Sequence, residues 1–311
     1  MTISFKAYTG IAGFTPEFHR VHEFLIRLNH PKVINEGFLW GRWEWMFSLS
    51  LLDLSNLHNI GIWEDDGEIV ALATYEQTVG NVWFVVDPGY TFLKEEMLLY
   101  SIEKLGKDGN ISVLIRDSDS DCQEIAAGLD FKPTQGCERN AVISIEEAFT
   151  QYTLPEGYCI VSLADEMDLN KYNRVLWRGF NHEGDAPETP DSLQSRRVEL
   201  SGPHVNLNLK IAVAAPNDEF VAYCGMWYLP GSDYALVEPV ATDPAYRMMG
   251  LGKAAVLEGV RRCGQLGAKQ AFVGSSQQFY YNIGFRPYST ETWWARSSCH
   301  KVNEDTETAL E

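Results

Sequence analysis

The chain has no long apolar run. No stretch of its 311 residues approaches the ~20 consecutive apolar residues that a membrane-spanning helix needs. The opening residues Met1–Lys6 show no basic segment followed by an apolar run, so no signal peptide is predicted. We therefore expect a cytoplasmic protein without a membrane partner.

Cysteine and histidine are also sparse, and neither forms a metal-binding pattern. The two histidines closest together, His19 and His22, lie three apart on a predicted helix without a second ligand pair. No C-x-x-C occurs, and the spacing predicts reduced thiols rather than a disulfide framework. No metal is predicted. The six cysteines are Cys122, Cys137, Cys159, Cys224, Cys263 and Cys299.

Basic residues are too few for a nucleic-acid-binding protein. The formal charge is −18, from 25 basic and 43 acidic residues, which disfavours a phosphate backbone as partner. The sign reverses within residues 244–290, where six basic residues accompany one acid, Glu258. Either a helix has a basic solvent face there, or an anionic ligand binds. The six are Arg247, Lys253, Arg261, Arg262, Lys269 and Arg286.

Length and an internal repeat predict two domains. A chain of 311 residues suits two domains of ~150 residues, and 45% hydrophobic residues can fill two cores. Residues 66–90 and 217–246 each read as paired strands ending at D-P-x-Y, followed by a predicted helix (92–105 or 251–266). A further strand follows at 111–115 or 270–273, and then a short helix that ends at F-[KR]-P.

The repeat also has a consistent spacing. From the Asp of D-P-x-Y to the Phe of F-[KR]-P there are 44 residues in the first half and 42 in the second. This agreement predicts a duplicated α/β domain, joined near Glu146–Gly157. Residues 297–311 read as a polar, frayed tail.

Each half opens with predicted helices. In the first half, Thr15-Pro16 starts a helix that runs to Asn29, and a second spans Trp40–Leu51. In the second half, a helix starts at Ser162 or Asp165 and runs through Trp177. Another spans Ser192–Leu200.

A glycine-containing loop precedes the helix of the second half. Gly250 and Gly252 let the backbone approach a ligand, and the first helical turn leaves N–H groups unpaired at the positive end of the helix dipole. These features favour a pyrophosphate. A P-loop needs G-x-x-x-x-G-K-[ST], which is absent. The dinucleotide pattern G-x-G-x-x-[GA] matches residues 250–255, but the preceding strand ends some seven residues too early, and no acid follows the next strand.

Two motifs resemble those of the GNAT N-acetyltransferase superfamily. Arg247-x-x-Gly250-x-Gly252 is similar to the family's acyl-CoA pyrophosphate loop, [QR]-x-x-G-x-[GA]. Residues 279–285 are similar to its F-Y-x-x-x-G-F segment, in the family's order and at about its spacing. The resemblance is specific over 219–295 and architectural over 1–150. It implies an α/β fold of two GNAT-like domains: a degenerate one at 1–150 and an active one at 156–311.

The fold that this resemblance implies has a mixed, mostly antiparallel, twisted sheet in each domain, flanked by helices. A splayed pair of parallel strands would admit the pantetheine arm of acetyl-CoA, the implied co-substrate. Pro239 has no N–H to donate, so Val240 and Thr242 are the expected hydrogen-bonding partners of that arm. Ser275 or Ser276 would replace a family asparagine, and Asn282 is assigned to the same site. The phosphate loop would comprise Arg247, Met248, Met249, Gly250, Leu251, Gly252 and Lys253, with a possible contribution from Arg286.

The resemblance also implies two catalytic residues. An alkylammonium with a pKa near ~10.4 must lose a proton before it can attack a thioester. Glu238 is the predicted general base, and Tyr280 the predicted acid that protonates the leaving sulfur. Each has a plainer interpretation, because Glu238 could fix its strand or act as a counter-charge and Tyr280 could be a core residue. Cys224 and Cys263 have no neighbouring His, so direct transfer in a ternary complex is expected.

The first half lacks these features. Thr91–Glu96 follows its D-P-x-Y without glycine or arginine, and Ala126 stands where the second half has Tyr280. This half would support its neighbour or form a wall of the acceptor cleft with Trp40, Trp43 and Trp45, although the favoured interpretation of these tryptophans is that they are core residues.

Two other functions fit the same motifs. One is an acyltransferase with another acyl group or acceptor, such as a tandem-domain enzyme that acylates a thiol-protecting amino sugar. The other is a non-catalytic acyl-CoA sensor. The acidic chain favours a cationic amine or peptide acceptor through electrostatic steering. The sequence does not reveal the acceptor or the oligomeric state.

Overall fold

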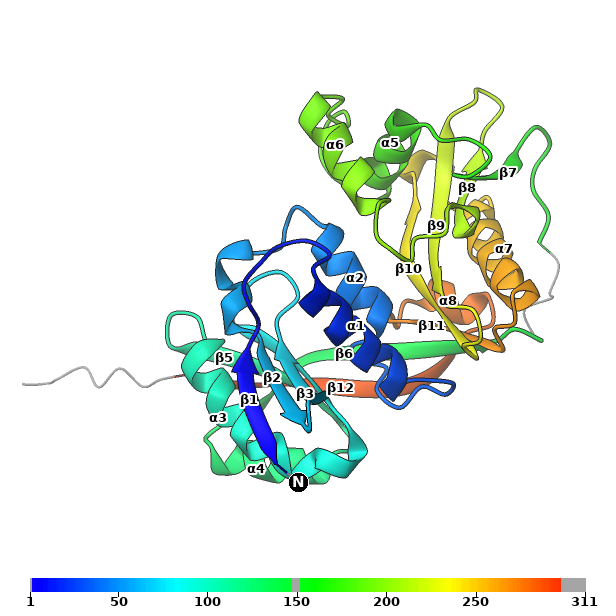
Figure 1. Ribbon diagram of the computed structural model, residues 1–311. Coiled ribbons are helices and arrows are strands. Elements are labelled where there is room, and N and C mark those ends of the chain that lie inside the picture. Colours follow the sequence, from blue (N-terminus) through cyan, green and yellow to red (C-terminus); the bar gives the residue numbers. More distant parts are fainter. Residues whose placement is uncertain (1, 147–151, 298–311) are drawn as a thin grey trace, which may run out of the picture.

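The computed structural model describes residues 2–146 and 152–297. Strands from both halves form one twelve-stranded, mixed sheet in the order β1-β2-β3-β4-β5-β12-β6-β11-β10-β9-β8-β7 (Figure 1). Within the described residues, no helix is long and apolar enough to cross a membrane. The strands are β1 (Ile3–Ala7), β2 (Gly61–Asp65), β3 (Glu68–Thr74), β4 (Asn81–Val86), β5 (Asn110–Arg116), β6 (Lys132–Ser144), β7 (Cys159–Ser162), β8 (Lys210–Ala214), β9 (Phe220–Tyr228), β10 (Tyr234–Thr242), β11 (Gln270–Val273) and β12 (Arg286–Ser297).

The first half carries four α-helices. Thr15 caps the first of them by accepting a hydrogen bond from the Phe18 N–H, as its position before Pro16 predicts. Two 3-10 helices, η1 (Leu54–Asn59) and η2 (Pro88–Leu93), precede β2 and the third α-helix. The α-helices are α1 (Pro16–Leu28), α2 (Trp40–Ser48), α3 (Lys94–Lys104) and α4 (Ser120–Gly128).

The second half repeats this plan. Helices α5 and α6 pack together near β9 and β10, whereas α7 packs against the other side of these strands. Short 3-10 helices, η4 (Leu207–Leu209) and η5 (Pro244–Tyr246), lie before β8 and α7. The α-helices are α5 (Leu169–Gly179), α6 (Pro190–Glu199), α7 (Leu251–Gln265) and α8 (Gln278–Asn282).

The last strand of each half pairs with strands of the other half. Strand β12 lies between β5 and β6, and β6 in turn pairs with β11. Figure 1 shows these two long strands running side by side from the first half toward the second. The two halves are therefore joined through the backbone hydrogen bonds of one continuous sheet as well as through the connecting segment.

The hydrophobic core also crosses between the halves. The largest cluster of buried apolar side chains belongs mainly to the first half, but Trp227, Leu236 and Phe272 of the second half lie within it. Two smaller clusters fill the second half, one beneath α7 and one beneath α5. The burial of Trp40 and Trp43 in the first cluster confirms the interpretation of these tryptophans as core residues.

Most predicted elements occur within two residues of their expected bounds, with one clear error. The helix expected to start at Ser162 or Asp165 begins at Leu169, because the Asp168 carboxylate caps it and Ser162 ends β7. The helix expected over Trp40–Leu51 ends at Ser48. The predicted join at Glu146–Gly157 lies partly, and the predicted tail at 297–311 almost wholly, outside the described residues. The expected α/β architecture, a mixed, mostly antiparallel sheet flanked by helices in each half, is confirmed.

Candidate active site

The parallel strands β10 and β11 pair only at their beginnings. Tyr234–Leu236 lies in register with Gln270–Phe272, and no further pairs follow. From Val237 onward the two strands diverge, as the sequence analysis expected for the arm of an acyl-CoA. The edge of β10 that follows this point is thus free of β11 and open to a ligand that pairs like an added strand.

A β-bulge places Glu238 at this point of divergence. The pairing of β10 with β9 shifts register between Val237 and Val240, so Glu238 and Pro239 stand outside the regular ladder. The indole N–H of Trp227 donates a 3.0 Å hydrogen bond to the Glu238 carbonyl oxygen. Gly225 lies opposite, and a Cβ there would collide with that same carbonyl oxygen. The bulge is held by contacts that require a glycine on the neighbouring strand.

Glu238 and Tyr280 line one cavity of about 970 Å³, here called the main cavity. Its walls come from both halves. Trp45 and Gln77 belong to the first half, while Val240 and Ser275 belong to the second. One of the three tryptophans expected to form this wall, Trp45, therefore does so. The volume is within the upper range of ligand-binding pockets, ~300–1,000 Å³.

The surroundings of Glu238 favour its protonated form. Burial raises the pKa of the Glu238 carboxyl to about 7, and the negative charges of Glu76 and Glu138 raise it further, while Arg42 and Lys210 oppose the shift. The side chain is half-buried. A carboxyl with a pKa close to neutrality can both take up and release a proton at physiological pH.

Tyr280 extends from α8 into the same cavity. The ring packs at 5.5 Å from that of Phe285 and 5.0 Å from that of Phe279, and only 7% of the residue is exposed. Burial raises the pKa of the Tyr280 hydroxyl, and the Glu238 charge adds to this effect. The hydroxyl is therefore protonated at neutral pH and available as a donor. Both the packing role and the acid role remain open to it.

The loop before α7 has the geometry of an anion site. Met248 and Gly250 adopt positive φ angles of 64° and 80°, and Gly250 is the residue before the first helical turn. A Cβ on Gly252 would lie 2.7 Å from the Thr242 hydroxyl oxygen, so this position requires glycine. Lys253 lies in the first turn without an ion-pair partner in the described part of the chain. The N–H groups of this turn are available to a phosphate.

Arg247 makes contacts that the sequence did not suggest. Its guanidinium donates hydrogen bonds to the carbonyl oxygens of Thr242 and Gly179 and to the Asn181 amide oxygen, at 2.9–3.2 Å. These contacts fasten the end of β10 to the end of α5. The assignment of Arg247 to the phosphate stays a prediction.

Three of the six basic residues over 244–290 form ion pairs within the protein. Arg261 and Arg262 both bind the Glu258 carboxylate, which lies on the same helix, at 2.7–2.8 Å. Lys269 pairs with Asp233 at 2.9 Å. These three basic residues therefore already have partners in the protein, and the case for an anion site rests on the loop itself.

The other residues assigned to the cofactor differ in position. Val240 and Ser275 line the main cavity, and the Ser275 hydroxyl accepts a hydrogen bond from the Gln277 N–H. Asn282 lies on the exposed side of α8, where its amide oxygen binds Gln278. Thr242 ends β10 beside Gly252. The structure brings Val240 and Ser275 together around Glu238 and leaves Asn282 apart.

The thiols near the site are poor nucleophiles. Cys224 and Cys263 are both buried, and burial raises the pKa of Cys263 to about 12 and that of Cys224 further. Both remain protonated at neutral pH. This agrees with direct transfer rather than a covalent thioester on the protein.

The first half has the same strand divergence, but acidic residues begin the helix where the second half has its glycine loop. Strands β4 and β5 pair only over Asn81–Trp83 and Ser112–Leu114. Helix α3, which lies between these two strands in the chain, has Glu95 and Glu96 in its first turn. The Trp63 indole N–H donates a hydrogen bond to the Glu96 carboxylate. Carboxylates there would repel a phosphate.

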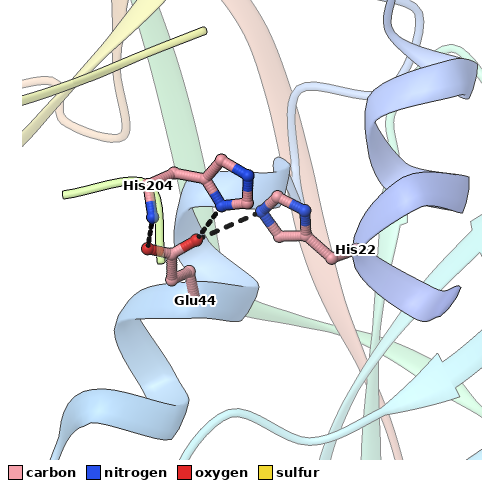
Figure 2. Close-up of side chains that lie close together, drawn as sticks. All are labelled: His22, Glu44 and His204. Carbon is pink, nitrogen blue, oxygen red and sulfur yellow. Dashed lines mark hydrogen bonds and ion pairs between the residues drawn. The ribbon is translucent and has the colours of Figure 1, made fainter. Parts of the chain in front are cut away.

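A cluster of two histidines and a glutamate joins the halves on the side of α1 and α2. The Glu44 carboxylate accepts hydrogen bonds from the backbone N–H and ring nitrogen Nδ1 of His204, both at 2.8 Å, and lies 3.3 Å from Nε2 of His22 (Figure 2). In the described ranges, no other three His, Cys, Asp or Glu residues bring possible ligand atoms within 4.8 Å of one another. No pattern in the sequence indicates this cluster, because His204 is 160 residues away from Glu44.

The geometry of this cluster favours a shared carboxylate over a metal ion. The rings of His22 and His204 stack with centroids 4.4 Å apart and planes inclined by 12°. An ion lies in the plane of each imidazole that binds it, and two nearly parallel planes at this separation do not meet at one ion. The Glu44 carboxylate therefore links the two halves by hydrogen bonds.

Comparisons with known proteins agree with this architecture. Residues 172–285 match the family described as Acetyltransferase (GNAT) family. No curated protein matches the sequence. The chain is similar in structure to a tandem GNAT protein from the clavulanic acid biosynthesis pathway, with a TM-score of 0.61, 11% identity, and coverage of 95% of this chain and 98% of that one.

Two further structures share the fold. A GCN5-related N-acetyltransferase from Sphaerobacter thermophilus has a TM-score of 0.56 and 12% identity, with 95% of each chain covered. An N-myristoyltransferase from Saccharomyces cerevisiae with bound myristoyl-CoA has a TM-score of 0.50 and 9% identity, with coverage of 94% of this chain and 78% of that one. At such identities the likeness concerns the fold, while the family match concerns the sequence of the second half. Residues 172–285 thus match the GNAT acetyltransferase family, and the whole chain shares the fold of a tandem GNAT protein.

Proposed function

We propose that this protein transfers an acetyl group from acetyl-CoA to a primary amine, by direct attack in a ternary complex. The observation that carries the proposal is the common position of Glu238 and Tyr280 on the main cavity, at the point where β10 and β11 diverge. The glycine loop before α7 would hold the pyrophosphate, and the free edge of β10 would hold the pantetheine arm.

The acceptor nitrogen must lose two protons, one before and one after it attacks, and the departing sulfur must gain one. Glu238 takes the proton from the acceptor ammonium, directly or through water, and the neutral amine attacks the thioester carbonyl carbon. The carbon–sulfur bond breaks as the carbon–nitrogen bond is completed. Tyr280 donates its proton to the departing CoA sulfur. The nitrogen of the new amide releases its second proton to solvent, and Tyr280 regains one from solvent. The raised pKa values of both groups suit these protonation states at neutral pH.

Tyr280 should matter less than Glu238. The CoA thiol has a pKa near that of cysteine, ~8.5, and leaves as a thiolate with little help. For Tyr280→Phe we expect kcat to fall about tenfold with the KM for acetyl-CoA unchanged, measured by thiol release. A Tyr280→Phe enzyme with wild-type kcat would leave Tyr280 with the packing role alone.

The test of the cofactor site is a calorimetric titration of acetyl-CoA. We expect micromolar binding at one site per chain, lost in the double variant Gly250→Glu/Gly252→Glu, because acidic side chains would occupy the anion site. Two sites would contradict a degenerate first half. No binding by the wild-type protein would remove the proposed function. Binding without transfer to any amine would favour an acyl-CoA sensor, and a higher affinity for a longer acyl-CoA would assign another acyl group.

A further inference from the structure

The charged side chains of the main cavity cancel in pairs, with two exceptions. Of the three guanidinium groups that line it, the Arg42 guanidinium binds the carboxylates of Glu76 and Glu138, at 2.6 and 2.9 Å. The Arg196 guanidinium binds Glu199 at 2.6 Å and the Asn173 amide oxygen at 2.9 Å. These two arginines are occupied by the protein itself.

Arg139 is the third guanidinium, and it has no such partner. It lies on β6, opposite Thr290 of β12, and its side chain is exposed. No carboxylate or hydrogen-bond acceptor within residues 2–146 and 152–297 is paired with it. Arg139 also lines a second cavity, of about 480 Å³, that adjoins the main one. Because the Arg139 guanidinium has no partner in the described residues, it can bind an anion that enters the main cavity.

The carboxyl groups show the same pattern. Glu138 and Glu199 line the main cavity, and each is paired with an arginine. Glu238 makes no ion pair in the described part of the chain, and in the proposed reaction it receives the proton of the acceptor amine. Among the arginines and carboxyl groups that line the main cavity, only Arg139 and Glu238 have no ion-pair partner in the described residues. The Glu76 carboxylate, which shares Arg42 with Glu138, adds one more negative charge beside the cavity.

We propose that the acceptor is a small amine that also carries an anionic group, and that Arg139 binds this group while the amine faces Glu238. The inference rests on the proposed N-acetyltransferase function and specifies its acceptor class. A guanidinium presents paired N–H donors that match the oxygens of a carboxylate or a phosphate. Electrostatic steering by the acidic chain favoured a purely cationic acceptor. The unpaired Arg139 revises that expectation, because recognition inside the cavity depends on local charges.

The cavity also limits the size of the acceptor. Trp45, Trp177 and Phe180 provide apolar surface for its body. A volume of about 970 Å³ must also admit the pantetheine arm, so the remaining space suits an amino acid or an amino sugar phosphate. We therefore expect the acceptor to be a small molecule rather than a folded protein.

The experiment compares matched amines that differ in the anionic group alone. L-lysine is paired with cadaverine for a carboxylate, and glucosamine 6-phosphate with glucosamine for a phosphate. Binding to the CoA-saturated wild-type protein is measured by calorimetry, and acetyl transfer by thiol release. In at least one pair we expect the anionic member to bind about 10- to 100-fold more tightly, as a hydrogen-bonded charge contact supplies.

The variants assign this preference to one side chain. In Arg139→Gln the anionic member should lose its advantage while its counterpart without the anionic group binds as before, and Arg139→Lys should restore part of the preference. Arg197→Gln is the matched control, because Arg197 is an exposed arginine that does not line the cavity. It should leave the preference unchanged. This pattern separates a binding role from a general loss of stability.

The outcomes that overturn the inference differ from those that remove the proposed function. Equal binding of both members in both pairs overturns the inference, even if acetyl transfer occurs. A preference that persists in Arg139→Gln also overturns it, and so does a failure of both anionic amines to bind. The proposed function fails if acetyl-CoA does not bind or if no acetyl group is transferred. The binding comparison tests the role of Arg139 in either case.

Discussion

Glu238 shows how its surroundings determine what a carboxyl group can do. The resemblance to a family located this residue on the strand beside the expected thioester. It could not reveal that Arg42, Glu76 and Glu138 of the first half set the electrostatic field around Glu238. Those residues are 100 or more positions away along the chain, and only the folded structure brings their charges to the site.

The pKa of Glu238 leads to a prediction about pH. Because the pKa is raised to about 7 and the base must be deprotonated, kcat/KM should rise with pH and level off above about 7. Glu238→Gln should lower kcat by ~10²- to 10⁴-fold and abolish this dependence. The measurement is a pH series of thiol release at saturating and limiting amine concentrations.

Glu291 provides the control for this profile. Burial raises the pKa of Glu291 to about 7 as well, but this residue does not line the main cavity. Glu291→Gln should keep the rising limb of the profile, whatever its effect on stability. If instead the limb disappears in Glu291→Gln and remains in Glu238→Gln, Glu238 is not the base.

At the scale of elements, the β-bulge in β10 depends on a glycine in β9. An alanine at Gly225 would press its Cβ against the Glu238 carbonyl oxygen, so the bulge must move or β9 must bend. We expect Gly225→Ala to lower the free energy of unfolding by ~1–3 kcal/mol, the usual range for overpacking. We also expect kcat to fall at least tenfold with acetyl-CoA binding retained, because the phosphate loop lies elsewhere.

Gly128→Ala is the matched substitution for this prediction. Gly128 ends α4, and nothing lies within 4 Å of a Cβ built there. Its replacement should leave both activity and stability near those of the wild-type protein. Chemical denaturation and calorimetric titration of acetyl-CoA measure the two effects separately. Full activity in Gly225→Ala would show that the bulge does not position Glu238.

The elements differed in how far the sequence could predict them. Local signals worked well, since the Thr15 cap and the spacing of apolar residues place α1 and α7 within two residues of their bounds. Strands β6 and β12 are exchanged, in the sense that each pairs with strands of the other half. No local signal predicts this exchange, because the same residues allow a strand to pair within its own domain or with the neighbouring one. Arg139 and Glu138, which line the main cavity from β6, were missed for this reason.

At the scale of the whole molecule, the cluster of His22, Glu44 and His204 couples the two halves to pH. Burial lowers the pKa of His22, so the folded state resists protonation while the unfolded chain accepts a proton near ~6.5. Stability should therefore decrease as the pH falls below about 6.5. Burial alone would raise the pKa of Glu44, but hydrogen bonds from both histidines lower it to about 2. The stability of the folded state should therefore decrease a second time as the pH falls below about 4.5.

The variant His22→Gln tests this assignment. Glutamine carries no proton to gain, so the decrease in Tm between pH 7 and pH 5 should be smaller than in the wild-type protein. His58→Gln, at an exposed histidine on η1, should leave that decrease unchanged. Thermal unfolding at a series of pH values measures both. An identical decrease in His22→Gln and the wild-type protein would assign the acid sensitivity to other groups.

The continuous sheet makes the two halves one folding unit. Strand β12 lies between β5 and β6 in the sheet. A fragment of residues 1–150 therefore lacks β12, the strand that pairs with both β5 and β6. A fragment of residues 156–311 likewise lacks β6, the partner of both β11 and β12. Neither fragment can complete its sheet, and each would leave exposed strand edges that favour aggregation. We therefore expect the intact chain to unfold in a single calorimetric transition.

The fragments should complement each other. Produced separately, each is expected to lack a cooperative thermal transition; produced together, they should form a 1:1 complex that binds acetyl-CoA. Gel filtration, calorimetry and the acetyl-CoA titration measure these three properties. Fragments that fold alone as monomers, with transitions at the Tm of the intact chain, would show that each half can complete its own sheet. In that event the exchange of β6 and β12 would contribute nothing to stability, and the first half could be removed without loss of the cofactor site.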